Sequence, residues 1–256
     1  MSNLKSDEIC YNMNLKNRLA LVTGASRGIG YYTALELSKA GAHVIACART
    51  ISKLEELRNT LQNLKKKIDI IAFDLQDIQA IDLGKLYIAR RWGKLDILIA
   101  NAGILGPICP LEKIQETSFK NVLSVNVVAN WHLIRSFSPL LTKSDFGRAI
   151  MVSSGAAHKC RPFWGAYSAS KAAVETLVRT WANETANTAL RIISIDPGPT
   201  RTAMRAQAKP EEDPKTVPHP EKIAQMIARL SSSQTIETGK LFSAQKGRFV
   251  EYISPE

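Results

Sequence analysis

The chain has 256 residues, of which 45% are hydrophobic and 22% are charged. This composition is typical of a globular protein and excludes wholesale disorder. No stretch approaches the ~18 consecutive apolar residues of a membrane span, and the opening MSNLKSDEIC lacks the apolar core of a secretory signal. We therefore expect a cytoplasmic protein without membrane association, whose four scattered cysteines stay reduced.

The charge balance is basic, with 34 Lys and Arg against 23 Asp and Glu. Such a surplus can attract nucleic acid, anionic surfaces or phosphorylated small molecules. The densest basic run is only Lys65-Lys66-Lys67, and the aromatic residues do not interleave with the cations, which argues against nucleic-acid binding. The four histidines show no ligand spacing, so we expect no metal site.

Short apolar runs alternate with helix-length amphipathic segments from about residue 18 to about residue 245. The runs are continuous, as strands buried on both faces should be. This alternation predicts an α/β fold, namely a Rossmann-type doubly wound parallel sheet flanked by helices in a single domain. The expected strands are Arg18–Thr23, His43–Ala48, Ile68–Phe73, Leu95–Asn101, Ala149–Ser154, Arg191–Asp196 and Leu241–Ala244, and the expected helices include Tyr31–Ala40, Ser52–Leu64, Asn121–Leu140 and Ala166–Thr188.

The ends of the chain and one internal segment depart from this alternation of expected strands and helices. Residues 1–14 are expected to form an N-terminal arm before a single domain over 15–256. Met204–Pro220 is rich in proline and carries an acidic cluster at 211–213. We expect a lid-like, irregular excursion around residues 199–220.

The first expected strand runs directly into a glycine-rich turn, and a helix follows. Glycine is needed where the chain turns tightly and where backbone must approach a pyrophosphate, and the helix N-terminus offers free N–H groups to phosphates. A glycine triplet alone is a weak signal, but here it has the required strand–turn–helix context. The turn reads Gly24-Ala25-Ser26-Arg27-Gly28-Ile29-Gly30.

The second expected strand ends at Ala48-Arg49, where an acidic residue would select NAD. Two guanidinium groups, Arg27 and Arg49, could instead clamp a 2′-phosphate. We therefore expect NADP(H) to be preferred over NAD(H); the alternative is that both arginines simply face water. Asp74-Leu75, just after the third strand, is positioned to meet the adenine.

Tyr167 and Lys171 are four residues apart at the start of a long helix, so they share one face. A phenol is a poor acid–base group at neutral pH, and a neighbouring ammonium lowers its pKa. Ser154 ends the fifth strand, at the edge where ligand should lie, and Asn126 falls in the preceding helical segment.

In this order, these motifs together resemble the short-chain dehydrogenase/reductase family, of the classical type. The match covers about residues 15–245 and is closest to a poorly characterised bacterial oxidoreductase subgroup related to 3-oxoacyl-acyl-carrier-protein reductases. It also includes Asn101-Ala102-Gly103 and Pro197-Gly198…Thr202. Ala100 and Ile193 replace asparagines common in the family, and Asp196 precedes the Pro, so acyl-carrier specificity is not carried over.

The resemblance implies hydride transfer between nicotinamide and a ketone, an aldehyde or a secondary alcohol. Tyr167 would exchange a proton with the substrate oxygen, Lys171 would hold the nicotinamide ribose, and Ser154 would bind the substrate oxygen. Asn126 would hold a water behind Lys171. The cofactor would also meet Asn101, Ala102, Gly103, Pro197, Gly198, Thr200 and Thr202.

The substrate pocket is less clearly marked. His158 follows Ser154 by four residues and could face substrate, and Trp164 could wall an apolar pocket or simply pack against the next helix. Leu105 and Met204 are further candidates. A 3-oxoacyl thioester is one substrate alternative, and a non-catalytic NADP(H)-binding regulator is the alternative from another class. Family resemblance and excess apolar helix surface suggest a homodimer or homotetramer.

Overall fold

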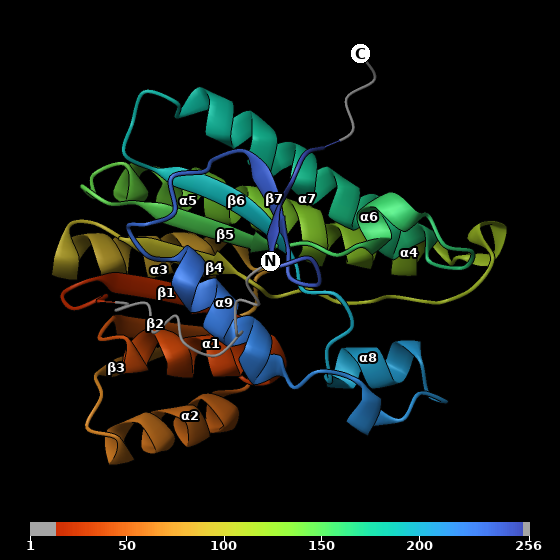
Figure 1. Ribbon diagram of the computed structural model, residues 1–256, viewed down its shortest axis with the longest axis horizontal. Coiled ribbons are helices and arrows are strands. Elements are labelled where there is room, and N and C mark those ends of the chain that lie inside the picture. The colour runs from red at the N-terminus through yellow and green to blue at the C-terminus, as the bar shows by residue number, and fades with distance from the viewer. Residues whose placement is uncertain (1–13, 253–256) are drawn as a thin grey trace, which may run out of the picture.

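The structure is a computed structural model that describes residues 14–252 (Figure 1). An eight-stranded sheet runs through the molecule. The strand order is β3-β2-β1-β4-β5-β6-β7-β8. Neighbouring strands are parallel from β3 to β7, and β8 runs antiparallel to β7. The strands are β1 (Leu19–Thr23), β2 (His43–Ala48), β3 (Ile68–Ala72), β4 (Ile97–Ala100), β5 (Arg148–Val152), β6 (Arg191–Asp196), β7 (Lys240–Ser243) and β8 (Arg248–Val250).

Helices cover both faces of this sheet (Figure 1). Side chains from the two faces form two separate apolar clusters, one under α1 and α9 and the other under α5 and α7. Every residue of β1, β4 and β5 is buried, which explains their continuous apolar sequences. The predicted doubly wound α/β fold is confirmed. The main helices are α1 (Gly28–Lys39), α2 (Ile51–Asn63), α3 (Ile78–Trp92), α5 (Ala129–Leu141), α7 (Gly165–Glu184) and α9 (Pro220–Leu230).

The strand order reverses at β1, which lies between β2 and β4. β2 and β3 lie on one side of β1, and β4 to β8 lie on the other. Such a reversal leaves a crevice outside the carboxyl ends of the strands, which is where open α/β sheets bind ligands. The loops that follow β1, β4, β5 and β6 all meet there.

The expected excursion after β6 contains more regular structure than its sequence suggested. It holds the short helix α8 (Ala203–Ala208) and the 3₁₀ turn η3 (Pro214–Thr216). Arg205 of α8 forms a bidentate ion pair with Glu212, which lies between these two elements, with Nε to Oε2 at 2.6 Å. In Figure 1, α8 stands apart from the sheet at the end where the strands finish.

The C-terminal hairpin was not anticipated. β8 is only three residues long and pairs with β7, with Phe249 packed edge-to-face on Phe242 at 5.2 Å. The remaining short helices are η1 (Leu111–Lys113), α4 (Glu116–Leu123), the π-helical turn η2 (Ser124–Val128) and α6 (Ala156–Lys159). The expected N-terminal arm lies outside the described residues, apart from Asn14. None of the helices within 14–252 combines the length and apolarity that a bilayer crossing requires.

Candidate active site

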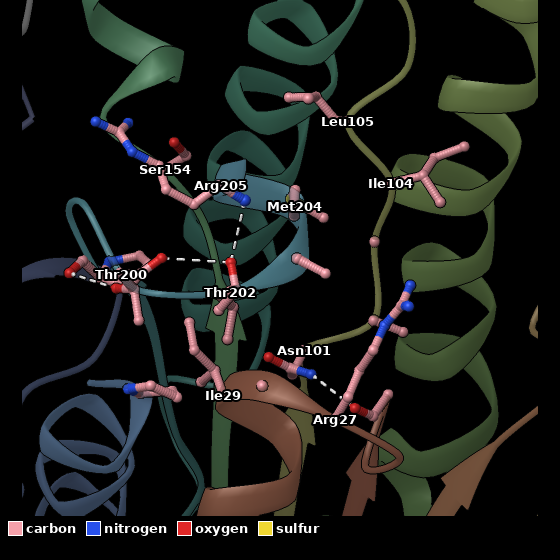
Figure 2. Close-up of a pocket in the computed structure, with 18 of the residues that line it drawn as sticks. Arg27, Ile29, Asn101, Ile104, Leu105, Ser154, Thr200, Thr202, Met204 and Arg205 are labelled. Atoms are coloured by element: carbon pink, nitrogen blue, oxygen red, sulfur yellow. Dashed lines mark hydrogen bonds between the residues drawn. The ribbon is translucent and has the colours of Figure 1, made fainter. Parts of the chain in front are cut away.

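A cavity of about 860 Å³ opens at the carboxyl ends of the strands. In Figure 2, Arg27 and Asn101 lie toward one end of this cavity, and Leu105, Met204 and Ser154 lie toward the other. All but three of the residues expected to bind cofactor, substrate or the reacting groups line it. The three that do not are Gly30, Asn126 and His158.

The glycine-rich turn after β1 forms the floor of one end of the cavity. Gly24 has φ +66°, a conformation that favours glycine. A Cβ built on Gly30 would lie 2.3 Å from the Gly24 carbonyl oxygen, so Gly30 permits the close approach between turn and helix. α1 begins at Gly28, and its N-cap residue Arg27 makes no side-chain cap bond. The helix N-terminus therefore faces the cavity with N–H groups that suit an anion such as a diphosphate.

Two arginines flank the end of β2. Arg27 and Arg49 line the cavity, and their guanidinium groups are not held in buried contacts. Arg49 Nη1 lies 3.8 Å from Asp74 Oδ2, with both side chains largely exposed. A loose ion pair of this kind contributes little on its own, so Arg49 is free to turn toward a phosphate. Leu75 adds an apolar surface beside Asp74.

The carboxyl ends of β1 and β4 are joined by side-chain hydrogen bonds. Thr23 Oγ1 accepts from the backbone N–H groups of Asn101 at 3.1 Å and Ala102 at 3.2 Å. Asn101 Nδ2 donates to the Thr23 carbonyl at 3.0 Å. Asn101 thereby fixes the spacing of the two strands, and the backbone of Ala102 and Gly103 lines the cavity beyond them.

Tyr167, Lys171 and Ser154 come together where β5 ends and α7 begins. The Lys171 Nζ lies 5.7 Å from the centre of the Tyr167 ring. It donates a 2.7 Å hydrogen bond to the Val152 carbonyl. Both side chains are buried, at 8% exposure for Tyr167 and 3% for Lys171. Ser154 Oγ accepts from the Ala156 N–H at 3.2 Å and reaches Tyr167.

Burial has opposite effects on the two titratable groups. It raises the pKa of Tyr167 to about 12, an effect that the hydrogen bond with Ser154 opposes and the Asp196 charge adds to. Burial lowers the pKa of Lys171 to about 8, against the influence of the Glu175 carboxylate. In both cases the charged form is disfavoured because it has left water.

Asn126 lies behind this group rather than in the cavity. The expected single helix over 121–140 is interrupted by the π-helical turn η2, and Asn126 sits in that turn. Its Oδ1 accepts from the Ile104 N–H at 2.9 Å, and its Nδ2 donates to the Ile104 carbonyl and to Ser170 Oγ. The Asn126 carbonyl accepts from Asn130 Nδ2 at 2.6 Å. Asn126 is thus held by protein partners; that it also holds a water remains a prediction.

The loop after β6 closes the other wall. Asp196 Oδ1 accepts from the Gly198 N–H at 3.0 Å, which shapes the Pro197-Gly198 turn. Thr202 caps α8 by accepting from the Arg205 N–H at 3.2 Å (Figure 2). The methyl group of Thr202 faces Gly28, so the two walls of the cavity approach each other there. Thr200, on the same loop, is buried and also lines the cavity.

The expected substrate residues divide into two groups. Leu105, Trp164 and Met204 pack around Tyr167 in a small apolar cluster. The Trp164 ring meets the Tyr167 ring edge-on at 6.0 Å. His158, in contrast, was expected to face substrate and does not line the cavity. Its imidazole, on α6, turns instead toward the buried Glu175 carboxylate, 2.8 Å away.

Several cavity residues were missed by sequence reasoning. They lie on the loops after β4 and β6, on α8, in α1 or at the start of α9, and no local motif marks them. His219 is an example, since it caps α9 and packs edge-on against Tyr32 at 4.7 Å. The missed residues include Tyr32, Ile104, Arg201, Arg205, Gln207 and His219.

Comparison with known proteins places this geometry in context. Residues 18–213 match the sequence model described as short chain dehydrogenase. The chain is 36% identical over 241 residues to the oxidoreductase YciK of Escherichia coli K12, covering 91% of this chain and 94% of YciK. It is 29% identical over 245 residues to the 3-oxoacyl-[acyl-carrier-protein] reductase FabG of Thermotoga maritima, covering 92% and 99%. A short chain dehydrogenase from Escherichia coli CFT073, solved in complex with NADPH, aligns with a TM-score of 0.87 at 35% identity, covering 91% and 99%.

Proposed function

This chain belongs to the short-chain dehydrogenase family of oxidoreductases, as its sequence resemblance indicated, and on that premise we propose that it transfers a hydride between NADP(H) and a ketone, an aldehyde or a secondary alcohol. The observation that carries the proposal is the meeting of Tyr167, Lys171 and Ser154 at the end of the cavity that the glycine turn opens. The family supplies the class of reaction, and these residues supply the local chemistry.

The cavity fits a dinucleotide at its glycine end. A Cβ on Gly24 or Gly30 would collide with Asn101 and the backbone of the turn, so the glycines keep the turn tight, and the unblocked N-terminus of α1 favours a diphosphate. When bound, nicotinamide would supply the hydride that the protein itself cannot provide. Lys171 would then meet the ribose of that half of the cofactor, beside Asn101 and Gly103.

The side chains of the protein would supply the proton that the substrate oxygen receives. In the reductive direction, the Tyr167 hydroxyl donates its proton to the carbonyl oxygen as the carbonyl carbon accepts the hydride. The Ser154 hydroxyl donates a hydrogen bond to the same oxygen and stabilises its developing charge. The ammonium of Lys171 favours the phenolate that Tyr167 becomes. Burial excludes water from these groups, which strengthens each interaction.

A preference for NADP(H) over NAD(H) is part of this proposal. Arg49 follows the end of β2, where Ala48 occupies the place of an acidic residue, and Arg27 lines the same cavity from the glycine-rich turn. The solved relative from Escherichia coli CFT073 bound NADPH, which supports the assignment. A guanidinium group recognises a 2′-phosphate and has no such partner in NAD(H).

The apolar cluster of Leu105, Trp164 and Met204 beside Tyr167 favours a substrate with an apolar group next to its carbonyl. A 3-oxoacyl thioester is a narrower candidate, supported by the similarity to FabG.

We also propose a homodimer or homotetramer, because Val128 and Trp131 expose apolar surface on one helical region. Light scattering would test this, and a monomer at every concentration would contradict it.

The function is tested by following NADPH absorbance in the presence of aliphatic and aromatic ketones, aldehydes and acetoacetyl thioesters. We expect oxidation of NADPH with at least one apolar carbonyl compound and slower oxidation of NADH. Tight NADPH binding without turnover of any carbonyl or alcohol would instead favour the non-catalytic regulator.

A further inference from the structure

A carboxylate lies buried directly behind the site. Glu175 follows Lys171 by one turn of α7 and is 3% exposed. It is not among the residues that line the cavity, so it cannot meet substrate or cofactor from its present position. Burying a carboxylate is costly unless its charge is compensated. Its retention at this position therefore calls for a physical reason.

Each oxygen of Glu175 has a polar partner, one through a hydrogen bond and the other through a charged-pair contact. Oε1 accepts from the Ser153 hydroxyl at 2.6 Å, and Ser153 is the immediate neighbour of Ser154. Oε2 lies 2.8 Å from His158 Nε2. The His158 side chain is 44% exposed, so this contact connects the buried carboxylate to solvent. The hydrogen bond to Ser153 ties α7 to the end of β5, and the contact with His158 ties it to α6.

Other charged or titratable groups face Glu175 from each neighbouring element. Lys171 and Arg179 lie one turn before and one turn after it on α7, and Asp196 ends β6. From the C-terminal segment, Tyr252 bonds its hydroxyl to Ser194 at 2.6 Å and places its ring 4.7 Å from the Arg179 guanidinium. Burial and Asp196 raise the pKa of Glu175, whereas Ser153, His158 and Arg179 lower it. On balance burial, the largest influence, keeps the pKa of Glu175 raised, so its ionised form depends on these three partners.

The buried ammonium of Lys171 needs a negatively charged partner. Its hydrogen bond goes to the Val152 carbonyl, which is neutral and only partly compensates a buried ammonium. The charge that opposes the desolvation of Lys171 comes from Glu175. Since the proposed proton transfer depends on a cationic lysine, the carboxylate one turn away bears directly on it.

We propose that Glu175 is a positioning residue for Lys171: its carboxylate keeps the buried ammonium charged, and His158 with Ser153 keeps the carboxylate ionised and in place. This inference rests on the proposed function, because it assigns a task to Lys171. Glu175 acts through Lys171 and touches neither substrate nor cofactor. A purely structural role, in which the same bonds only fasten α7 to β5 and α6, makes different predictions.

The test compares Glu175→Gln with the wild-type protein. Glutamine keeps the shape and an acceptor for Ser153 but removes the charge. The control is Glu36→Gln, which removes a carboxylate of similar burial on α1 that pairs with Lys39 at 2.7 Å, away from the cavity. Carbonyl reduction is measured as kcat and KM against pH. In Glu175→Gln, we expect the alkaline fall in kcat to begin about one pH unit lower, with kcat near the wild-type value on the acid side.

A second readout does not need turnover. In protein labelled with ¹³C-lysine, the Lys171 signal is identified by its loss in Lys171→Met, and its shift is followed against pH. Glu175→Gln should lower the Lys171 titration midpoint by about one pH unit. His158→Ala should lower it by less, and it keeps the test usable if Glu175→Gln does not fold. Glu36→Gln should leave the midpoint unchanged.

Two outcomes would overturn the proposal. One is an unchanged Lys171 midpoint in both Glu175→Gln and His158→Ala. The other is a loss of kcat by the same factor at every pH, which is what a fastening role alone produces. If the wild-type protein turns over no carbonyl compound, the proposed function fails, while the lysine titration still decides the role of Glu175.

Discussion

The ammonium of Lys171 lies 5.7 Å from the centre of the Tyr167 ring, on the same face of α7 and beneath the cavity. Four residues separate the two side chains, which is the spacing that brings neighbours together on a helix. Ser154 reaches the Tyr167 hydroxyl from the end of β5. The phenol of Tyr167 therefore lies between the Ser154 hydroxyl and the Lys171 ammonium, and it also borders the cavity.

The pH dependence of reduction follows from the buried lysine. Burial lowers the pKa of Lys171 to about 8, so the ammonium is present below that pH and is lost as the pH rises through it. We expect kcat for carbonyl reduction to be level on the acid side and to fall about tenfold per pH unit above about pH 8. Steady-state kinetics between about pH 6 and about pH 10 check this. A kcat that stays level to the alkaline end would be inconsistent with a required ammonium.

Removing either cavity arginine, Arg27 or Arg49, should weaken NADPH binding selectively. For Arg27→Ala and Arg49→Ala, we expect the Kd of NADPH to rise by about tenfold, or ~1.4 kcal/mol, because a charge-assisted bond to the 2′-phosphate is lost. The Kd of NADH should change by less than about twofold. Fluorescence titration measures both. Arg58→Ala, at an exposed α2 arginine that pairs loosely with Glu55 at 3.6 Å and does not line the cavity, is the control. Equal losses for the two cofactors would refute the 2′-phosphate role.

Gly30→Ala should abolish cofactor binding. The added methyl group would lie 2.3 Å from the Gly24 carbonyl oxygen, so either the turn or α1 must shift at the diphosphate end. Calorimetric titration with NADPH should detect no binding. Gly93→Ala is the matched control, since Gly93 has φ +74° and a methyl group added there would meet nothing within 4 Å. It should cost about 1 kcal/mol of stability and leave the Kd unchanged. Normal NADPH binding by Gly30→Ala would contradict this prediction, because it would show that the turn can accommodate the added methyl group.

Trp164 should set the preference for apolar carbonyl compounds. In Trp164→Ala, the apolar wall beside Tyr167 is lost, and we expect KM for a bulky aromatic ketone to rise by about 10- to 100-fold, in line with ~2 kcal/mol of lost burial. KM for a small aliphatic ketone should change little. Phe163→Ala serves as the control, because the neighbouring Phe163 is 54% exposed and does not line the cavity. Uniform changes across substrates would contradict a specificity role.

Much of the fold could be predicted because its sequence signals are strong. β1, β4 and β5 are buried throughout, so their apolar runs are uninterrupted, and the turn at Gly24–Gly30 has a backbone geometry that glycine allows. β8 escaped notice because three residues at a sheet edge leave little pattern. α8 was expected to be irregular because it is only six residues long and is secured by an ion pair, between Arg205 and Glu212, that does not follow helical spacing.

In the site, too, some features have a clear sequence signal and others depend on how distant segments fold together. Tyr167 and Lys171 could be paired from their helical spacing alone, since α7 forms around them. The direction of His158 could not, because it depends on how α6 turns after Ser154 and on a carboxylate seventeen positions further along (175 − 158 = 17). Glu175 itself lies one turn after Lys171, and that spacing was the only sequence signal that could have drawn attention to it. The π-helical turn that holds Asn126 has no recognised signature in this chain.

The most direct test of the proposed chemistry is Tyr167→Phe, which removes one oxygen from a side chain that is 8% exposed and leaves its ring packed against Trp164. Turnover of the best carbonyl substrate and the Kd of NADPH are measured on the same preparation. We expect kcat to fall by at least about 10²-fold, with the Kd of NADPH within about twofold of the wild-type value. Turnover near the wild-type rate, with NADPH still bound, would contradict the assignment of Tyr167 as the proton donor.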